Sequence, residues 1–308
     1  MRLVSYTYKK SSAYSYIGAL YQEKIIDLNH AYRLFIQSEQ KEAYVEVDAM
    51  LPANPDQFYA IGLSAIDRAR QAFDYVINSG VENCLIDQEQ VVIHTPVPNP
   101  AKIICVGKNY ADHVAEMKSD LPEYPVLFAK FTNVLIGPED AIVKSKATDK
   151  LDYEAELTIV IGKEASSVSE EDALDYVAGF TIGNDVSARD LQKRTPQWLQ
   201  GKTLDRSTPV GPWVVTRDEI SDMSNLDIKS FVNGELRQSS NTEHLIFTVP
   251  YLISFISNLI TLKPGDIILT GTPDGVGFAM DPPQFLKDGD TVKVEIEEIG
   301  VLENRVEE

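Results

Sequence analysis

Three carboxylates alternate along one short stretch of the sequence. The segment Leu151–Ile161 reads LDYEAELTIVI and places Asp152, Glu154 and Glu156 two residues apart. Side chains alternate between the two faces of a β-strand, so we expect these three to lie on one face. A divalent cation with oxygen ligands would neutralise their mutual repulsion. A solvated acidic edge strand is the alternative, but the apolar continuation LTIVI favours the metal site, because a solvated strand would not continue into the core.

A fourth carboxylate follows the next predicted strand. Asp185 comes just after the strand predicted over 177–182, in the sequence GFTIGNDVSARD. Alone it is more typical of a turn or a helix cap. Together with Glu154 and Glu156 it would form a set of three carboxylates with open coordination positions. Few, hard oxygen ligands favour Mg²⁺ or Mn²⁺ over Zn²⁺.

A histidine and a glutamate share one face of a predicted short helix. The run 107–117, GKNYADHVAEM, is predicted to form a helix capped by Asn109, with Asp112 at its third position. His113 and Glu116 are then neighbours. A carboxylate that orients an imidazole raises its basicity, as a general base requires, whereas an exposed ion pair would contribute little. The remaining histidines lack such a neighbour and are interpreted as structural or surface residues: His30, His94 and His244.

A glycine-rich segment and two cations carry weaker signals. The segment Gly271–Gly277, GTPDGVG, follows a strand predicted over 266–270. Its backbone amides could bind a carboxylate or a phosphate, or it could be only a tight turn. No GK[ST] sequence follows, which excludes a P-loop. Lys202 and Arg189 lie near Asp185 in the sequence, but most such side chains are solvated, so spacing alone assigns them no role.

The composition restricts the classes of partner. The chain of 308 residues has 28 Lys and Arg against 47 Asp and Glu, a net charge of −19, which disfavours nucleic acid and anionic membranes as partners. An anionic substrate would need a local reversal of this field. The two cysteines, Cys84 and Cys105, form no CxxC pair, which favours a reducing compartment. No signal-peptide core and no membrane-length apolar run occur, so we expect a cytoplasmic protein.

The elements that must position these residues change in character near residue 95. The length favours two domains. Residues 1–95 are predicted to form a small α+β domain, with strands over 3–8, 14–20 and 24–27 and a helix over 56–78. The segment TPVPNP, ending at Pro100, is interpreted as a linker because proline restricts both itself and the preceding residue.

Residues 96–308 are predicted to form a larger, strand-rich domain. An Asn233-Gly234 pair indicates a hairpin, and helices are expected only over 169–176 and 248–259 besides the short run at 107–117. The fold class is therefore mostly β (α+β). Strands are predicted where β-branched runs are bounded by turn residues: 103–106, 126–130, 157–161, 177–182, 213–216, 228–232, 266–270 and 292–296.

Taken together, these segments resemble the fumarylacetoacetate hydrolase family. The resemblance extends from about Pro98 to Val306 and implies a mixed β-sandwich roll that follows a small N-terminal domain, usually assembled as a homodimer. One departure is Phe131, where many relatives have proline. The matching segments occur in the order of the family: KIICVGKNYADHVAEM, PVLFAK, LDYEAELTIVIGK, VAGFTIGNDVSARDLQ, GKTLD, GPWVV, VNGELRQ, DIILTGTPDGVG and FLKDGDTVKVEIEEIG.

The resemblance also implies a role for each candidate residue. The implied metal ligands are Glu154, Glu156 and Asp185. The implied lid dyad and catalytic lysine are His113, Glu116 and Lys202. The implied substrate-binding residues are Lys130, Arg189, Gln192, Gly271 and Thr272.

The segment HVAEM within NYADH resembles the branch that acts on acylpyruvates and oxaloacetate. It implies an Mg²⁺- or Mn²⁺-dependent enzyme that cleaves a C–C bond of a small 2-oxo acid, by acylpyruvate hydrolysis or oxaloacetate decarboxylation. Lys202 would stabilise an enolate, and His113 would activate water or move a proton at C3. An isomerase or decarboxylase of hydroxymuconate-type dienes is the alternative. A non-catalytic binding protein is a third, against which the intact acidic and lysine residues argue.

Overall fold

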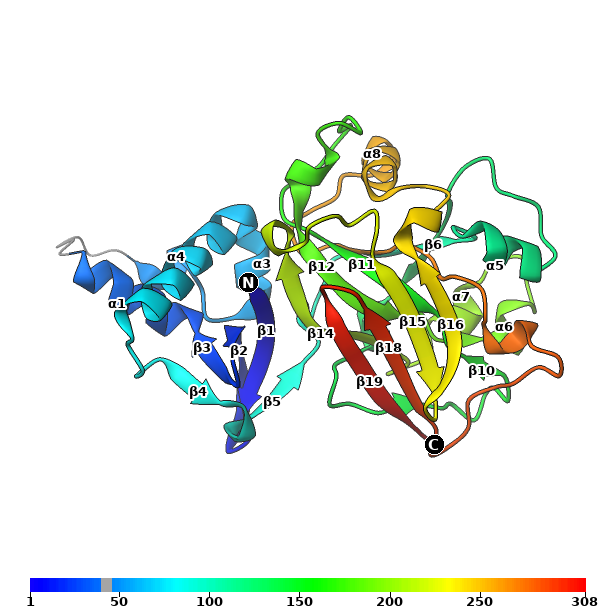
Figure 1. The fold of residues 1–308 in the computed structure, drawn as a ribbon, viewed down its shortest axis with the longest axis horizontal. Helices are drawn as coiled ribbons and strands as arrows, with labels where there is room; N and C mark the ends of the chain where they lie inside the picture. The colour runs from blue at the N-terminus through cyan, green and yellow to red at the C-terminus, as the bar shows by residue number, and fades with distance from the viewer. Residues whose placement is uncertain (40–45) are drawn as a thin grey trace.

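The computed structural model of the protein describes residues 1–39 and 46–308. Within them, twelve strands form one large sheet, in the order β4-β3-β2-β1-β14-β12-β11-β17-β6-β7, with β5 on β1 and β8 on β14. Five strands form a second sheet, β16-β15-β18-β19-β9, and β10 pairs with β13 (Figure 1). The strands are β1 (Arg2–Tyr8), β2 (Ser11–Tyr21), β3 (Lys24–Asp27), β4 (Leu85–Asp87), β5 (Val91–His94), β6 (Ile103–Gly107), β7 (Val126–Lys130), β8 (Leu135–Ile136), β9 (Ile142–Val143), β10 (Leu151–Asp152), β11 (Ala155–Ile161), β12 (Val177–Asn184), β13 (Ser187–Ala188), β14 (Thr208–Thr216), β15 (Asp227–Val232), β16 (Glu235–Asn241), β17 (Ile267–Leu269), β18 (Thr291–Ile296) and β19 (Gly300–Glu307).

Within the described part of the chain, the helices are short apart from α1, α4 and α8. Among the described residues, no helix combines the length and the apolar character needed to cross a membrane. The predicted helix over 169–176 is only a 3₁₀ turn, η3 (Ala173–Tyr176). The α-helices are α1 (Leu28–Ser38), α2 (Val47–Met50), α3 (Pro55–Ile61), α4 (Leu63–Ser79), α5 (Ala111–Glu116), α6 (Arg189–Gln192), α7 (Leu199–Lys202) and α8 (Val249–Leu259).

The prediction of a single helix over 56–78 is wrong, because the helix is interrupted at Gly62, between α3 and α4. Gly62 has a left-handed φ of 77°, and a Cβ at this position would overlap the carbonyl oxygen of Gly162. The amide of Leu63 donates to that same carbonyl at 2.8 Å. Apolar spacing continues across the break, so the pattern alone gives one helix. The turn is imposed by contact with a loop a hundred residues away.

The N-terminal elements extend the large sheet. Strand β1 pairs antiparallel with β14, placing Arg2 opposite Val215 and Leu3 opposite Val214. One apolar core includes Leu3 together with Ile267 and residues of α4. Figure 1 shows this N-terminal part beside the strand-rich part, joined at β1 and β14. A domain boundary at residue 95 stays a prediction.

The strand-rich part has two layers. Buried residues of β11 and β12, such as Ile159 and Phe180, share a core with Ile228 and Val294 of the second sheet. The predicted hairpin is present between β15 and β16, where Asn233 and Gly234 have φ values of 52° and 81°, as a tight turn of this kind requires. The predicted mostly β (α+β) class is confirmed.

Gly62 and Gly80 provide a matched test of how the two parts are joined. Both have left-handed φ, but a Cβ at Gly80 would meet no atom within 4 Å. We expect Gly80→Ala to lower the free energy of unfolding by about 1–2 kcal/mol, the cost of backbone strain alone. Gly62→Ala should lower it by at least twice as much, because the docked loop must also shift. Chemical denaturation measures both; equal losses would contradict the close approach.

Candidate metal centre and active site

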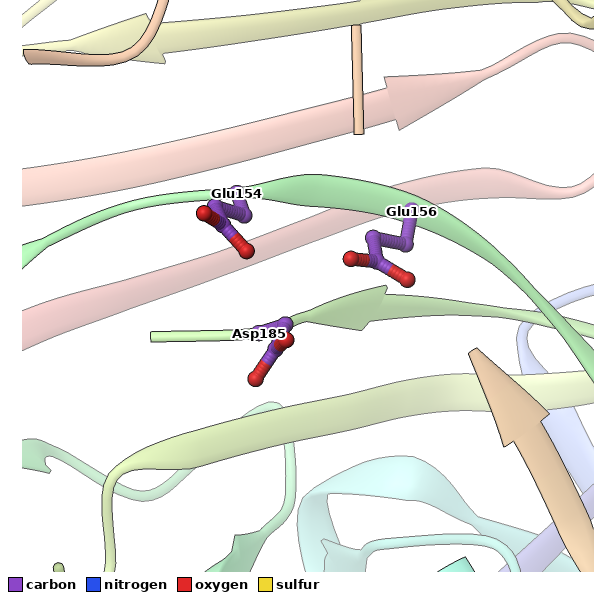
Figure 2. Close-up of side chains that lie close together, drawn as sticks. All are labelled: Glu154, Glu156 and Asp185. Carbon is purple, nitrogen blue, oxygen red and sulfur yellow. The ribbon is translucent and has the colours of Figure 1, made fainter. Parts of the chain in front are cut away.

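Glu154, Glu156 and Asp185 converge on one buried point. Each offers a carboxylate oxygen, and these oxygens lie within 4.8 Å of one another. The three residues are 5%, 2% and 0% exposed. Figure 2 shows Glu154 and Glu156 on one segment and Asp185 at the end of the neighbouring strand β12, with their side chains lying in the same space. The structure therefore brings together the three residues that the sequence predicts as metal ligands.

Asp152 does not belong to this group, so the expectation that three alternating carboxylates share one face is wrong for Asp152. Strand pairing is interrupted between β10 and β11, at Tyr153-Glu154. The alternation rule applies only within a continuous strand. Asp152 instead bonds the Nε of Arg189 at 2.8 Å and accepts the backbone amides of Gly277 and Phe278.

Three buried cations surround the carboxylates. Lys202 Nζ lies 2.7 Å from Glu154 Oε2 and 2.6 Å from Asp185 Oδ2. Lys130 pairs with the other oxygen of Asp185. Arg189 bridges Asp152 and Glu154, with its Nη1 2.7 Å from Glu154 Oε1. All three cationic side chains are at most 2% exposed.

The ionisation of these groups follows from burial and from their neighbours. Burial raises the pKa of Glu154, but Arg189 and Lys202 outweigh it and hold the pKa well below its ordinary value. Burial lowers the pKa of Lys202, but Asp185 and Glu154 outweigh it and raise the pKa above its ordinary value. Burial raises the pKa of Glu156 strongly, and the charges of Asp185 and Glu154 raise it further.

Glu156 is the carboxylate that the protein leaves without a cation. Among the described residues it forms no ion pair; its Oε2 accepts only the Gly271 amide, at 2.7 Å. Uncompensated negative charge in a dry site is costly. A divalent ion bound by Glu154, Glu156 and Asp185 would remove that cost, and three hard oxygen donors are the set that Mg²⁺ and Mn²⁺ prefer. The residues present therefore fit the expected metal.

The histidine–glutamate pair forms on α5. His113 Nδ1 lies 2.8 Å from Glu116 Oε1, and His113 is buried. The second oxygen of Glu116 accepts the amide of Gly275 at 2.9 Å. Because an ionised carboxylate only accepts, Nδ1 carries the hydrogen and Nε2 is the basic nitrogen.

The predicted capping role of Asn109 is wrong. Tyr110 occupies the N-cap of α5 and makes no side-chain capping bond. The fully buried amide of Asn109 instead bonds the carbonyl of Thr270 at 2.7 Å and both backbone groups of Phe247. Such long-range contacts leave no trace in the local pattern from which a cap is predicted. Asn109 thus fixes the start of α5 to two distant segments.

The glycine-rich loop binds carboxylates, but they are those of the protein itself. Its backbone amides donate to Glu156 from Gly271, to Glu116 from Gly275, and to Asp152 from Gly277. These donors are the ones that the sequence leaves open for a ligand carboxylate. Thr272 lines the cavity, and its hydroxyl accepts a bond from Gln238 at 2.7 Å. The loop therefore organises the site from one side.

One cavity of about 70 Å³ joins these groups. Lys130 and Gly271 do not line this cavity. Lys130 contacts Asp185, and Gly271 contacts Glu156. A larger, open cavity of about 690 Å³ adjoins Tyr153 and contains none of the predicted site residues. The predicted residues that line the smaller cavity are His113, Glu154, Glu156, Asp185, Arg189, Gln192, Lys202 and Thr272.

Gln238 is a site residue that the sequence reasoning missed. Its fully buried amide accepts bonds from the Ala155 amide at 3.1 Å and from Ser230, and donates to Thr272 and Pro273. It therefore holds the segment between the two glutamates against the glycine-rich loop. The motif VNGELRQ contains it, but a polar residue in a strand gives no sign of such a role.

Comparisons with known proteins agree with this geometry. The chain matches the family described as fumarylacetoacetate (FAA) hydrolase C-terminal over residues 102–307. The chain belongs to this family. It is 42% identical to the fumarylacetoacetate hydrolase domain-containing protein 2 homolog of Dictyostelium discoideum, covering 99% of this chain and 97% of that protein. It is 46% identical to the mitochondrial oxaloacetate tautomerase Fahd2a of Rattus norvegicus, covering 84% and 81%.

Solved structures share the fold. A maleylpyruvate hydrolase from Sphingobium sp. SYK-6, in complex with manganese(II) ion and pyruvate, aligns with a TM-score of 0.74 and 29% identity. The alignment covers 100% of this chain and 99% of that one. The similarity therefore extends over the N-terminal region as well as the strand-rich part.

Glu156→Gln tests the metal assignment. The amide can still accept the Gly271 bond, but the buried negative charge is lost. We expect the metal-free protein to be at least as stable as the wild type, while affinity for Mg²⁺ or Mn²⁺ falls more than about 100-fold. Calorimetric titration and thermal unfolding in a chelator measure the two effects. Glu164→Gln, an exposed glutamate beyond the same strand, should change neither; unchanged affinity in Glu156→Gln would overturn the site.

Gln238→Ala tests the contact between β11 and the glycine-rich loop. It leaves several buried partners unsatisfied, each costing about 1–3 kcal/mol, so the free energy of unfolding should fall by about 3 kcal/mol or more. Denaturant titration measures this. Gln57→Ala, on the exposed side of α3, should stay within about 0.5 kcal/mol of the wild type. A similarly small change for Gln238→Ala would contradict the role inferred for this residue.

Proposed function

We propose that the protein is a divalent-metal-dependent enzyme that interconverts the keto and enol forms of a small 2-oxo diacid of the oxaloacetate type. The observation that carries this proposal is that one cavity joins the carboxylate triad to the His113–Glu116 pair and to Lys202. The oxaloacetate tautomerase among the similar proteins supports it. The proposal builds on the membership of the chain in this family of enzymes.

The metal-binding residues would hold the acid by its oxygen atoms. Glu154, Glu156 and Asp185 would bind Mg²⁺ or Mn²⁺, which supplies Lewis acidity toward a 2-oxo carboxylate. Lys202 contributes a buried positive charge beside Glu154 and Asp185. A fixed cation in a site that excludes water stabilises negative charge on the C2 oxygen more than it would in solution.

His113 would move the proton. Its Nε2 takes the hydrogen from C3, the electron pair of that bond forms the C2–C3 double bond, and negative charge gathers on the C2 oxygen. That oxygen takes a proton from water to give the enol, and the imidazolium returns its proton to water. Glu116 orients the ring through Nδ1 and is itself held by the Gly275 amide. The reverse sequence returns the keto form.

C–C bond cleavage is the second candidate. Loss of carbon dioxide from oxaloacetate passes through an enolate that Lys202 could stabilise equally well. The neighbour that is a maleylpyruvate hydrolase, in complex with manganese and pyruvate, favours cleavage of acylpyruvates as a related possibility. Hydrolysis additionally requires an attacking water molecule, whereas tautomerisation and decarboxylation do not. The cavity is small, about 70 Å³, which favours short acids over long dienes.

His113→Gln and Glu116→Gln test the proton transfer. With Mg²⁺ and oxaloacetate, we expect kcat/KM for the loss of the enol ultraviolet absorbance to fall about 10²–10⁴-fold in His113→Gln, because a general base is removed. The loss in Glu116→Gln should be smaller. His244→Gln, at an exposed histidine, should keep full activity. No acceleration by the wild type over metal alone would overturn tautomerisation, and release of pyruvate without such acceleration would favour decarboxylation.

A further inference from the structure

Lys108 lies in the wall of the catalytic cavity with an unusual backbone. Its φ is 58°, in the left-handed region. Few residues other than glycine occupy this region, and lysine is not among those enriched there. Strain of this kind persists only where the surrounding structure imposes it.

The residues on both sides of Lys108 are fixed. A Cβ at Gly107 would lie 2.5 Å from the Trp198 ring, so the backbone packs directly against this aromatic side chain. Asn109 bonds Thr270 and Phe247 through its buried amide. Lys108 is thus presented to the cavity by a segment held at both ends. A cation on such a support loses less entropy on binding than one on a free loop.

Lys108 is the uncommitted cation of the cavity. Three cationic side chains line it, and protein carboxylates pair with two of them: Arg189 with Asp152 and Glu154, and Lys202 with Glu154 and Asp185. Arg189 keeps one buried nitrogen, Nη2, without a hydrogen-bond partner among the described residues, but its charge is already balanced by these two carboxylates. Among the described residues, the Lys108 side chain takes part in no ion pair and no hydrogen bond. In a chain with a net charge of −19, an unpaired lysine that lines the same cavity as the acidic residues is free for an anionic ligand.

A 2-oxo diacid has two carboxylates. The one next to the 2-oxo group would lie at the metal, and the second, distal carboxylate would lie away from it. This distal carboxylate would enter the same cavity and needs a hydrogen-bond donor or a cation there. The backbone amides of Gly271, Gly275 and Gly277 already donate their hydrogen bonds to carboxylates of the protein. We propose that Lys108 binds the distal carboxylate of the substrate and so selects dianionic over monoanionic 2-oxo acids. This inference rests on the proposed function.

Two four-carbon substrates separate the role of Lys108 from that of the metal end. Oxaloacetate carries the distal carboxylate, and 2-oxobutanoate carries a methyl group in its place. Lys108→Asn removes the charge with a residue that tolerates left-handed φ; Lys108→Gly removes it and relieves the strain, should the first variant fold poorly. Lys108→Arg keeps the charge. Lys118→Asn is the matched control, because Lys118 has a φ of 52° on the same segment, is exposed, and does not line the cavity.

Proton NMR in deuterium oxide, with Mg²⁺ present, follows the enzyme-dependent exchange of the C3 hydrogens for deuterium and gives kcat/KM for each of the two substrates. In Lys108→Asn and Lys108→Gly we expect kcat/KM for oxaloacetate to fall about 10- to 100-fold, as for a lost charged hydrogen bond. Exchange of 2-oxobutanoate should stay within about threefold. Lys108→Arg should recover most of the loss, and Lys118→Asn should match the wild type.

The outcomes distinguish the inference from the function beneath it. Equal losses for both substrates, or no loss for either, would overturn the role of Lys108 while leaving the proposed function intact. A wild-type enzyme that exchanges neither substrate would overturn the proposed function, and the inference with it.

Discussion

The structure depends on how excess negative charge is accommodated in a dry pocket. Four carboxylates, Asp152, Glu154, Glu156 and Asp185, are at least 95% buried, and three buried cations face them. Complete desolvation of an unpaired charge costs several kcal/mol, so every oxygen must be matched by a cation, an amide or a metal. Within the described residues, Glu156 is the member for which the protein supplies only an amide. That local imbalance, more than the count of acidic residues, is what would favour a cation in this pocket.

The glycine-rich loop links the parts that must act together. Its amides reach Glu156 of the triad, Glu116 of the lid pair and Asp152 beside Arg189. Two of its glycines have left-handed φ, and a Cβ on Gly275 would overlap the Arg237 carbonyl, so the loop can take this course only with glycine. Gln238 and Asn109 tie the same loop to β11 and to the start of α5. Displacement of the loop would therefore disturb both the carboxylate triad and the His113–Glu116 pair.

How much could be predicted from the sequence varies with the range of the interactions. Strands with strong β-branched patterns, such as β7, and the Asn233-Gly234 hairpin follow from local chemistry. The carboxylate triad could be predicted because two of its members, Glu154 and Glu156, lie two residues apart beside a buried strand. The contacts of Asp152, Asn109 and Gln238 could not be predicted, because their partners lie up to 161 residues away in the sequence. The break at Gly62 has the same cause, because the loop at Gly162 imposes it.

The net charge of −19 and an anionic substrate are compatible because they act at different distances. Exposed charges are screened over about 8 Å in physiological salt, whereas groups inside the pocket are screened much less. With all four carboxylates ionised against three cations, the buried groups carry one negative charge, and a bound divalent ion would turn this into one positive charge. A dianion entering the pocket would then meet an attractive field at the metal end. Lys108, unpaired at the cavity wall, would extend that field toward the far end of the acid. The acidic exterior would then serve solubility, while the sign of the site would be set by a few buried residues and the ion proposed to bind them.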